Sequence, residues 1–222
     1  MVKPRVLKRT PKGPKKTNAT TEASPAVISP SLSMAKALPT TPEQITRLQS
    51  TNVIKNMIRV SVSEICYLRN LFPEDVFRKR VYADMHINCL APNKDVAGTS
   101  MQDALTLTLW MEEGAFEALE KEYLEQLAFC IYGVGSDSKP TKLLESYSFK
   151  IRSTPDAVTL STNFLGGELV SSKPDKVKEQ AIQLIRSLVS ITNSLDALPG
   201  NRFITMKLTY NSGSPNPRSS ED

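Results

Sequence analysis

The sequence is poor in the residues that build metal centres and disulfide frameworks. It has one histidine, His86, and three cysteines, Cys66, Cys89 and Cys130, which lie far apart in apolar surroundings. One histidine cannot make a multi-histidine metal site, and the cysteines lack the close spacing of zinc ligands. Such a sparse, odd number of cysteines indicates buried free thiols in a reducing compartment. We therefore expect no metal and no other cofactor.

The sequence also lacks the motifs of nucleotide binding and of nucleophilic catalysis. The stretch "GVGSDS" (133–138) fits neither the Walker pattern nor the dinucleotide fingerprint, and the pair Gly166–Gly167 predicts only a turn. No serine or cysteine lies in a recognisable nucleophile context. No apolar run reaches about 18 residues, and no apolar segment follows the N-terminal basic residues as in a secretory signal. These absences predict a binding protein and not an enzyme.

Acidic residues are almost missing from the first 40 positions. This stretch holds eight Lys/Arg and one acid, Glu22, a net charge of +7, whereas the rest holds 20 Lys/Arg and 22 Asp/Glu, a net charge of −2. The basic character of the chain therefore belongs to its N-terminal part. A folded domain with a slight negative charge is a poor candidate for a basic nucleic-acid binder.

Residues 1–40 are rich in Lys, Pro, Ser and Thr and show no hydrophobic periodicity. Such a segment cannot bury enough apolar area to offset its ordering entropy, so we predict a disordered basic N-terminal tail. Its basic run is typical of a nuclear localisation signal, although a merely solubilising tail has the same composition. Three prolines disfavour the amphipathic helix of a mitochondrial presequence. The predicted signal comprises Lys3, Arg5, Lys8, Arg9, Lys12, Lys15 and Lys16.

Residues 41–211 carry the hydrophobic patterning of one folded domain. Apolar residues recur at helical spacing in three long segments: from Thr41, with Gln44 completing a capping box, to before Pro73; from a Ser100 cap to Tyr123; and over 175–198 after a Ser172 cap. We expect Leu119, Leu188 and Ile191 on the inner faces of their helices.

Four further segments have strand character. Residues 82–90 alternate partially and predict one short strand, while 127–134 and 143–152 predict an antiparallel hairpin. Residues 156–162 predict a poorer strand, and Arg202–Tyr210 predict the last one. Three long helices packed on a small, mainly antiparallel sheet make an α+β domain of two layers.

Four stretches together resemble one known family. They are "CYLRNLFPEDVF", "LWMEEGAFEALEKEYLEQLAFCIYG", "LLESYSFKIR" and "LPGNRFITMKLTY". In their order along the chain they are similar to the HORMA domain, and specifically to its meiotic chromosome-axis branch. The resemblance covers about residues 45–210. It implies a HORMA-like α+β fold and a non-enzymatic adaptor located in the nucleus on chromosomes.

The resemblance also implies a mode of action. HORMA domains bind a short closure-motif peptide of a partner, which adds as a strand beside the sheet. Meiotic members assemble in this way on chromosome axes, with other HORMA proteins or axis proteins as partners, and promote homologous recombination and synapsis. An AAA+ ATPase remodels them through a flexible N-terminal segment. The implied peptide-binding strand comprises Arg202, Phe203, Ile204, Thr205, Met206, Lys207, Leu208, Thr209 and Tyr210.

The sequence departs from the family after Tyr210. Members of the family continue with the strands of a safety belt that closes over the peptide, whereas residues 212–222 predict only a short disordered tail. The expectation is a core without this lock, with weak, rapidly exchanging peptide binding or self-association through the bare strand. Two alternatives stay open. One is a HORMA adaptor of the spindle-checkpoint or translesion-synthesis branch; the other is a chromatin or DNA binder acting through residues 3–16.

Overall fold

The structure is a computed structural model that describes residues 46–155, 157–170 and 174–211. The predicted tail 1–40 with its basic run, the predicted caps Thr41 and Ser172, and the residues after position 211 lie outside these ranges. No helix among the described residues is both long enough and apolar enough to cross a membrane.

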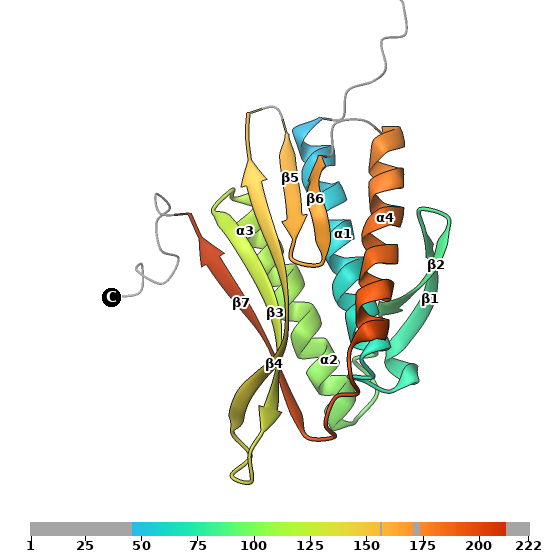
Figure 1. Cartoon of the computed structure of the whole chain (residues 1–222), viewed down its shortest axis with the longest axis vertical. Coiled ribbons are helices and arrows are strands. Elements are labelled where there is room, and N and C mark those ends of the chain that lie inside the picture. The colour runs from blue at the N-terminus through green and yellow to red at the C-terminus, as the bar shows by residue number, and fades with distance from the viewer. Residues whose placement is uncertain (1–45, 156, 171–173, 212–222) are drawn as a thin grey trace, which may run out of the picture. The chain divides into compact units, whose positions relative to one another are not determined.

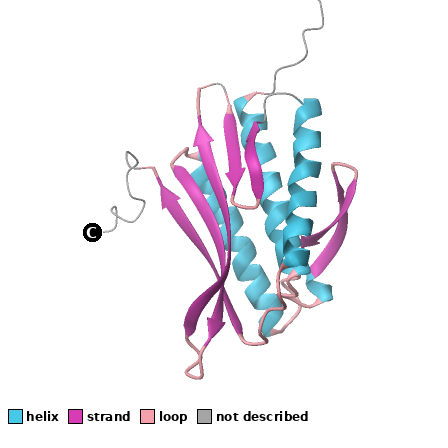
Figure 2. Cartoon of the chain, viewed as in Figure 1, coloured by secondary structure: helices cyan, strands magenta, loops and turns pink. Residues whose placement is uncertain are grey.

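The described chain forms a five-stranded antiparallel sheet, a separate two-stranded hairpin and three long helical segments (Figure 2). The helices cover one face of the large sheet (Figure 1). The predicted α+β fold is therefore confirmed. The elements in chain order are α1 (Arg47–Leu68), a short 3-10 turn (Glu74–Val76), β1 (Phe77–Tyr82), β2 (Met85–Leu90), α2 (Thr99–Leu109), a π-helical turn (Trp110–Ala115), α3 (Phe116–Glu120), β3 (Leu124–Val134), β4 (Pro140–Ser153), β5 (Val158–Thr162), β6 (Leu165–Val170), α4 (Pro174–Ser194) and β7 (Arg202–Tyr210).

Helix α1 is the centre of the domain. It packs against α3, α4, β2 and β5, and the seven consecutive residues from 60 to 66 are all buried. The second half of α1 therefore has no solvated face, which explains why its apolar stripe becomes broad and irregular there. Most of the core side chains, such as Phe116, Phe129 and Phe149, lie between α1, the α2–α3 segment and the sheet.

The start of α1 differs from the prediction. The helix begins at Arg47, and the capping box is formed by Thr46 and Gln49: the Gln49 backbone N–H donates to Thr46 Oγ1 at 3.3 Å, and the Thr46 N–H donates to Gln49 Oε1 at 2.7 Å. The sequence contains two capping-box patterns five residues apart, and the second one is used. The predicted cap at Ser100 is also wrong, because α2 follows Gly98 and has no side-chain cap.

The sequence patterns did not predict two of the strands, β1 and β6. The predicted single strand over 82–90 contains the last residue of β1, a turn and the whole of β2, and the turn places Ala83 and Asp84 at φ of 49° and 62°. Both turn residues thus adopt the left-handed conformation that a tight two-residue hairpin requires. The predicted turn at Gly166–Gly167 is wrong as well, because both glycines lie within β6.

The predicted inner face is correct for Leu119 of α3 and Leu188 of α4 and wrong for Ile191, which also lies in α4. Leu119 and Leu188 are buried, with 2% and 0% of their surface exposed. Ile191 is 36% exposed, because the buried face of α4 runs through Leu188 and Thr192, 0% and 3% exposed, and Ile191 lies beside it. The predicted hairpin of β3 and β4, the poorer strand β5 and the last strand β7 are all confirmed.

Candidate functional site

Strand β7 lies at one edge of the five-stranded sheet, whose order is β6-β5-β4-β3-β7 (Figure 1). It pairs antiparallel with β3 over its whole length, from Arg202 opposite Gly133 to Tyr210 opposite Leu124. Among the described residues no strand pairs with its other side. A nine-residue strand with an unpaired side presents a row of backbone donors and acceptors to an incoming chain.

The side chains of β7 alternate between the two faces of the sheet. Ile204, Met206 and Leu208 pack against the core, on the side that the helices cover. Side chains alternate in direction along a strand, so Phe203, Thr205, Lys207 and Thr209 lie on the outer face. The strand is therefore held by its inner side chains and by β3, and neither attachment uses the backbone groups on its free side.

The direction of the backbone groups can be traced across the sheet from β4. The Ser148 N–H donates to Asn163 Oδ1 at 2.8 Å, and Asn163 Nδ2 donates to the Ser146 carbonyl at 2.8 Å. The backbone groups of Ser146 and Ser148 thus point away from β3. Those of Tyr147 point toward β3, because backbone direction alternates along a strand.

The same alternation continues into β7. Tyr147 lies opposite Phe129 of β3, so the next residue, Cys130, directs its backbone groups to its own partner in β7, Thr205. The Asn211 N–H donates to the Tyr123 carbonyl at 2.9 Å, which gives the odd-numbered residues the same direction independently. The even-numbered residues therefore present their backbone N–H and C=O groups to the free edge. These residues are Arg202, Ile204, Met206, Leu208 and Tyr210.

The connection that leads from α4 into β7 is fixed by buried charge. Arg69, only 7% exposed, forms an ion pair with the carboxylate of Glu145 on β4. It also donates to the carbonyls of Thr192, at 3.4 Å, and Asp196, at 2.5 Å. Glu145 in turn accepts a 2.7 Å hydrogen bond from Tyr147 Oη, and burial together with this bond raises the pKa of Tyr147. The cation thus joins the end of α1, the sheet and the end of α4.

The first residue of β7 is attached to the same region. The Arg202 guanidinium donates to the backbone carbonyls of Asn70 and Pro199, the latter at 3.2 Å. Asn70 follows Arg69 directly and has a φ of 50°. The two residues that follow α1 therefore fix where β7 begins, Arg69 through its side chain and Asn70 through its backbone carbonyl.

The other end of β7 contacts the connection between α3 and β3, which is in turn paired with Arg47 at the start of α1. The Tyr210 ring packs edge-on against Tyr123 with 5.3 Å between the centroids, and Asn211 Nδ2 donates to the Glu122 carbonyl at 3.2 Å. The Glu122 carboxylate forms a 2.7 Å ion pair with Arg47. Both ends of the strand are thus attached to residues elsewhere in the domain.

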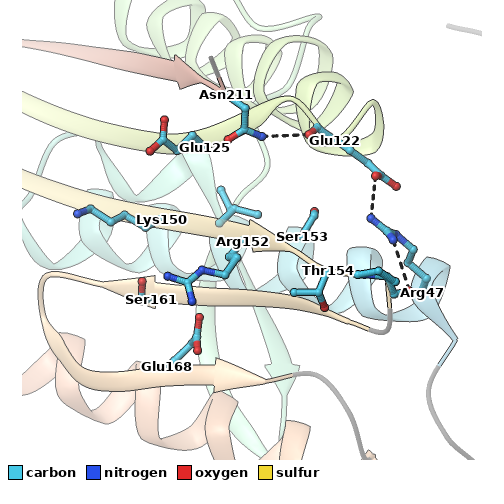
Figure 3. Close-up of a pocket in the computed structure, with 12 residues that line it drawn as sticks. Arg47, Glu122, Glu125, Lys150, Arg152, Ser153, Thr154, Ser161, Glu168 and Asn211 are labelled. Carbon is cyan, nitrogen blue, oxygen red and sulfur yellow. Dashed lines mark hydrogen bonds and ion pairs between the residues drawn. The ribbon is translucent and has the colours of Figure 1, made fainter. Parts of the chain in front are cut away.

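A polar hollow of about 640 Å³ lies beside this end of β7, over the outer face of the sheet (Figure 3). Arg47 and Glu122 close one side, Lys150 and Arg152 of β4 form its floor, and Glu168 of β6 lies opposite them. Its cations and carboxylates alternate, so it has no strong charge of one sign. No group of three or more His, Cys, Asp or Glu side chains among the described residues could hold a metal ion.

Lys207 is the one lysine on β7, and its charge is directed away from the free edge. Its Nζ donates to Tyr132 Oη on β3 at 2.6 Å and lies 5.2 Å from the centre of that ring. This hydrogen bond raises the pKa of Lys207. An edge strand is commonly protected by a lysine that projects past it. Here the ammonium group lies back over the sheet, so the free side of β7 keeps its access.

The structure places the predicted strand at a sheet edge, while the peptide-binding role of its residues stays a prediction. Sequence reasoning missed Arg69 and Glu145, which fix the connection into β7, and Asn163, which binds the backbone of β4. Arg69 lies in "YLRNLFP", where an arginine after a helix looks solvated, and its partners are 76 and more residues away. No local pattern could have identified that pairing.

Comparison with known proteins gives one family. A family model described as the HORMA domain matches residues 50–219. HORMA domain-containing protein 2 of Bos taurus is 32% identical over 182 residues, which cover 79% of this chain and 56% of that protein. HORMA domain-containing protein 1 of Xenopus laevis is 34% identical over 165 residues, 74% of this chain and 40% of that protein.

The meiosis-specific protein ASY1 of Arabidopsis thaliana is 32% identical over 180 residues, 75% of this chain and 28% of that protein. The chain thus spans about half the length, or less, of these curated relatives. Among solved structures, Caenorhabditis elegans HTP-2 bound to the HIM-3 closure motif has a TM-score of 0.61 at 18% identity, over 78% of this chain and 75% of that one. HTP-2 bound to HTP-3 closure motif 1 has a TM-score of 0.59 at 19% identity, over 76% of this chain and 69% of that one.

Proposed function

Because the chain belongs to the HORMA-domain family, we propose that it is a non-enzymatic adaptor that binds a partner's closure-motif peptide along the free edge of β7. The observation that carries this proposal is the edge itself, with five residues directing their backbone groups away from β3. In this mode an extended peptide continues the sheet, backbone hydrogen bonds supply affinity and side-chain pockets supply selectivity. The fold neighbours that hold closure motifs support the same mode of binding.

The size of the edge sets the affinity of edge pairing. A docked peptide strand makes about four to six backbone hydrogen bonds, each worth about 0.5–1.5 kcal/mol net. Apolar contacts add to this, while association itself costs at least about 4 kcal/mol. The balance is near −8 kcal/mol at best, which corresponds to a micromolar dissociation constant. Pairing along the edge alone is thus expected to be weak and to exchange rapidly.

We further propose that the adaptor acts on meiotic chromosome axes, in homologous recombination and synapsis. The curated relatives at 32–34% identity, including the meiosis-specific ASY1, support this branch. The mitotic checkpoint complex, with a TM-score of 0.52 at 12% identity, shares only the fold, so the spindle-checkpoint and translesion alternatives have less support. The proposed partners are closure motifs of axis proteins or of other HORMA proteins.

The N-terminal region completes the proposal. Its seven basic residues between Lys3 and Lys16 are proposed to direct nuclear import, and the whole segment to engage an AAA+ ATPase that remodels the domain. A fluorescent fusion that lacks residues 1–16 is expected to spread into the cytoplasm. A fusion that stays as nuclear as the full-length chain would place the import signal elsewhere or indicate import with a partner.

The test of peptide binding uses fluorescence anisotropy with labelled peptides that tile the chromosome-axis proteins and HORMA-protein tails of the source organism. Saturable, micromolar binding to one peptide is expected, with no binding to its scrambled sequence. If no tiled peptide binds saturably to the folded chain, the proposal is wrong. Transcripts confined to meiotic tissue would assign the meiotic branch, and uniform expression in dividing somatic cells would favour another branch.

A further inference from the structure

A second surface of the domain combines exposed apolar and acidic side chains. We name it the Trp110 surface; it comprises Asp103, Leu109, Trp110, Glu113 and Gly114 on the α2–α3 segment. Leu109 is 44% exposed and Trp110 is 40% exposed. Residues three to four positions apart share a helix face, so Asp103 and Glu113 lie along the same side as the tryptophan.

The helical segment has two unusual features at this surface, a π-helical turn and a glycine within it. A π-helical turn occupies Trp110–Ala115, and such turns are rare and occur frequently at functional sites. Gly114 lies within this turn, and a Cβ atom at its position would meet nothing within 4 Å. A glycine inside a helix makes that helix less stable than an alanine would. Neither a close contact nor a positive φ requires glycine at this position. It leaves open space beside the exposed indole.

The acidic side chains of this surface differ from those nearby. Glu112 forms an ion pair with Arg59 of α1, and Glu117 forms one with Lys121. Asp103 and Glu113 have neither a hydrogen bond nor an ion pair from their carboxylates within the described part of the chain. The Trp110 surface therefore fits a partner that offers an apolar side chain beside a cation.

The same chain carries a surface of that chemistry on β1. The basic strand surface comprises Arg78, Lys79, Arg80 and Val81, all exposed, with Val81 at 66%. Side chains alternate along a strand, so Lys79 and Val81 share one face, and Arg78 and Arg80 lie on the other, the face of Ile87. In the described ranges none of the three cations takes part in an ion pair or a side-chain hydrogen bond. The nearby Asp84 is already paired with Lys178 of α4.

The two surfaces are held apart within one molecule. The hairpin of β1 and β2 packs on α1 and α4 through Val60, Ile87 and Ile185. The α2–α3 segment lies on another side of α1, toward β3 and β7 (Figure 1). A contact between the two surfaces therefore needs two copies of the chain.

We propose that the Trp110 surface of one copy binds the basic strand surface of a second copy. Val81 of the second copy packs against Trp110 over Gly114, and Lys79, on the same face of β1, lies against the carboxylates of Glu113 and Asp103. The contact is head-to-tail, since different surfaces meet, and each copy keeps one free surface for the next. It does not use β7, so its success or failure is independent of peptide binding at that edge.

Sedimentation velocity of the full chain over a wide concentration range tests this contact. The mean mass is expected to rise with concentration and to fall at high salt, because screening weakens exposed ion pairs. Trp110→Ala, Glu113→Lys and Lys79→Glu should each weaken association about tenfold or more, as central aromatic and charged contacts do. The matched control Asp137→Lys reverses a charge at the exposed β3–β4 turn and should associate like the native chain.

The decisive sample is the double variant Glu113→Lys with Lys79→Glu. It exchanges the two charges between the surfaces and is expected to recover association, which a general effect of net charge or of misfolding would not allow. Thermal unfolding of each variant checks that it folds like the native chain. A protein that stays monomeric at every concentration would overturn the proposal, and so would association that survives all three single variants, because pairing would then use the β7 edge.

Discussion

The two edges of the five-stranded sheet are built differently. Strand β6 has six residues, contains Gly166 and Gly167, and packs against α4. Its register with β5 shifts near Thr162, and Leu169 is 97% buried, with 3% of its surface exposed. Strand β7 (Arg202–Tyr210) has nine residues and contains no glycine or proline. Four of its residues are exposed and the other five are partly exposed. One edge is short and packs against α4, and the other is long and bare.

This difference has a physical meaning. An open edge recruits strands from other chains, and most proteins protect it with bulges, short strands or projecting charges. β6 has such protection, whereas β7 has its only lysine drawn back over the sheet toward Tyr132. The proposed docking role gives a reason for leaving β7 open. The predictions below test whether the two edges differ in stability and in binding as their structures indicate.

The largest effect is expected at the buried cation that fixes the entry to β7. Arg69→Met leaves Glu145 buried without its partner and should lower the free energy of unfolding by about 3–5 kcal/mol. Urea denaturation measures the loss. The control is Arg59→Met, which breaks a partly exposed ion pair with Glu112 and should cost about 1 kcal/mol or less. Similar losses for both variants would contradict the role assigned to Arg69.

Truncation beneath the covered edge should follow in size. Leu188 of α4 is fully buried, and Leu188→Ala should cost about 2–5 kcal/mol and lower the melting temperature clearly. Glu113→Ala removes an exposed side chain without a partner and should leave the melting temperature almost unchanged. Equal shifts in a thermal melt would show that the assigned helix faces are wrong.

Proline substitutions separate the two sides of β7. Thr205→Pro removes a backbone N–H that faces β3, so it should destabilise the domain, because proline within a paired strand loses a ladder hydrogen bond. Met206→Pro removes a donor on the free side and should weaken peptide binding about two- to tenfold, the value of one hydrogen bond. The measurements are unfolding and anisotropy on both variants. The reverse outcome would mean that the even-numbered residues face β3.

The smallest effect on stability is expected at a third edge, that of β2. Side chains of α1 accept hydrogen bonds from the backbone N–H groups of this edge. The Asn88 N–H donates to the Glu64 carboxylate, and the Leu90 N–H donates to Ser63 Oγ at 3.1 Å. Burial raises the pKa of Glu64 above its ordinary value of 4.5, although the hydrogen bond from Asn88 lowers it. The stability that Glu64 contributes is therefore complete below pH 4.5 and is lost as the pH rises through its folded pKa.

Glu64→Gln keeps an acceptor for Asn88 and removes this titration. The variant should be at least as stable as the native chain near pH 7, and the difference should shrink as the pH falls toward 4.5. Unfolding curves over this range give the comparison. A native chain that gains stability relative to the variant as the pH rises would show that the hydrogen bond outweighs burial.

Local periodicity carried much of the fold. The alternation in Arg202–Tyr210 predicted a strand with the correct bounds, and the helical spacing around Leu119 and Leu188 identified buried faces. The β1–β2 turn was missed because Ala83–Asp84 lacks the Asn-Gly or Asp-Gly pattern of tight hairpins. Gly166–Gly167 predicted a turn because glycine is rare inside strands, and an edge strand tolerates it more readily.

The candidate site was only partly open to prediction. The strand could be recognised, but its position at an edge depends on the order of strands, which no local pattern contains. The free side of β7 follows from Asn163 with the pairs across β3 and β4, and independently from the Asn211–Tyr123 hydrogen bond. The Arg69–Glu145 pair joins residues 76 positions apart, so tertiary structure alone reveals it.

The most direct test of the docking edge is amide hydrogen exchange of β7 by NMR, with and without a bound closure-motif peptide. The amides of Thr205 and Lys207 face β3 and should exchange slowly in both samples. The amides of Ile204, Met206 and Leu208 should exchange rapidly in the free protein and become protected when the peptide binds. Bound peptide that leaves these three amides unprotected, or protects a different surface, would contradict the assignment of β7 as the peptide-docking edge.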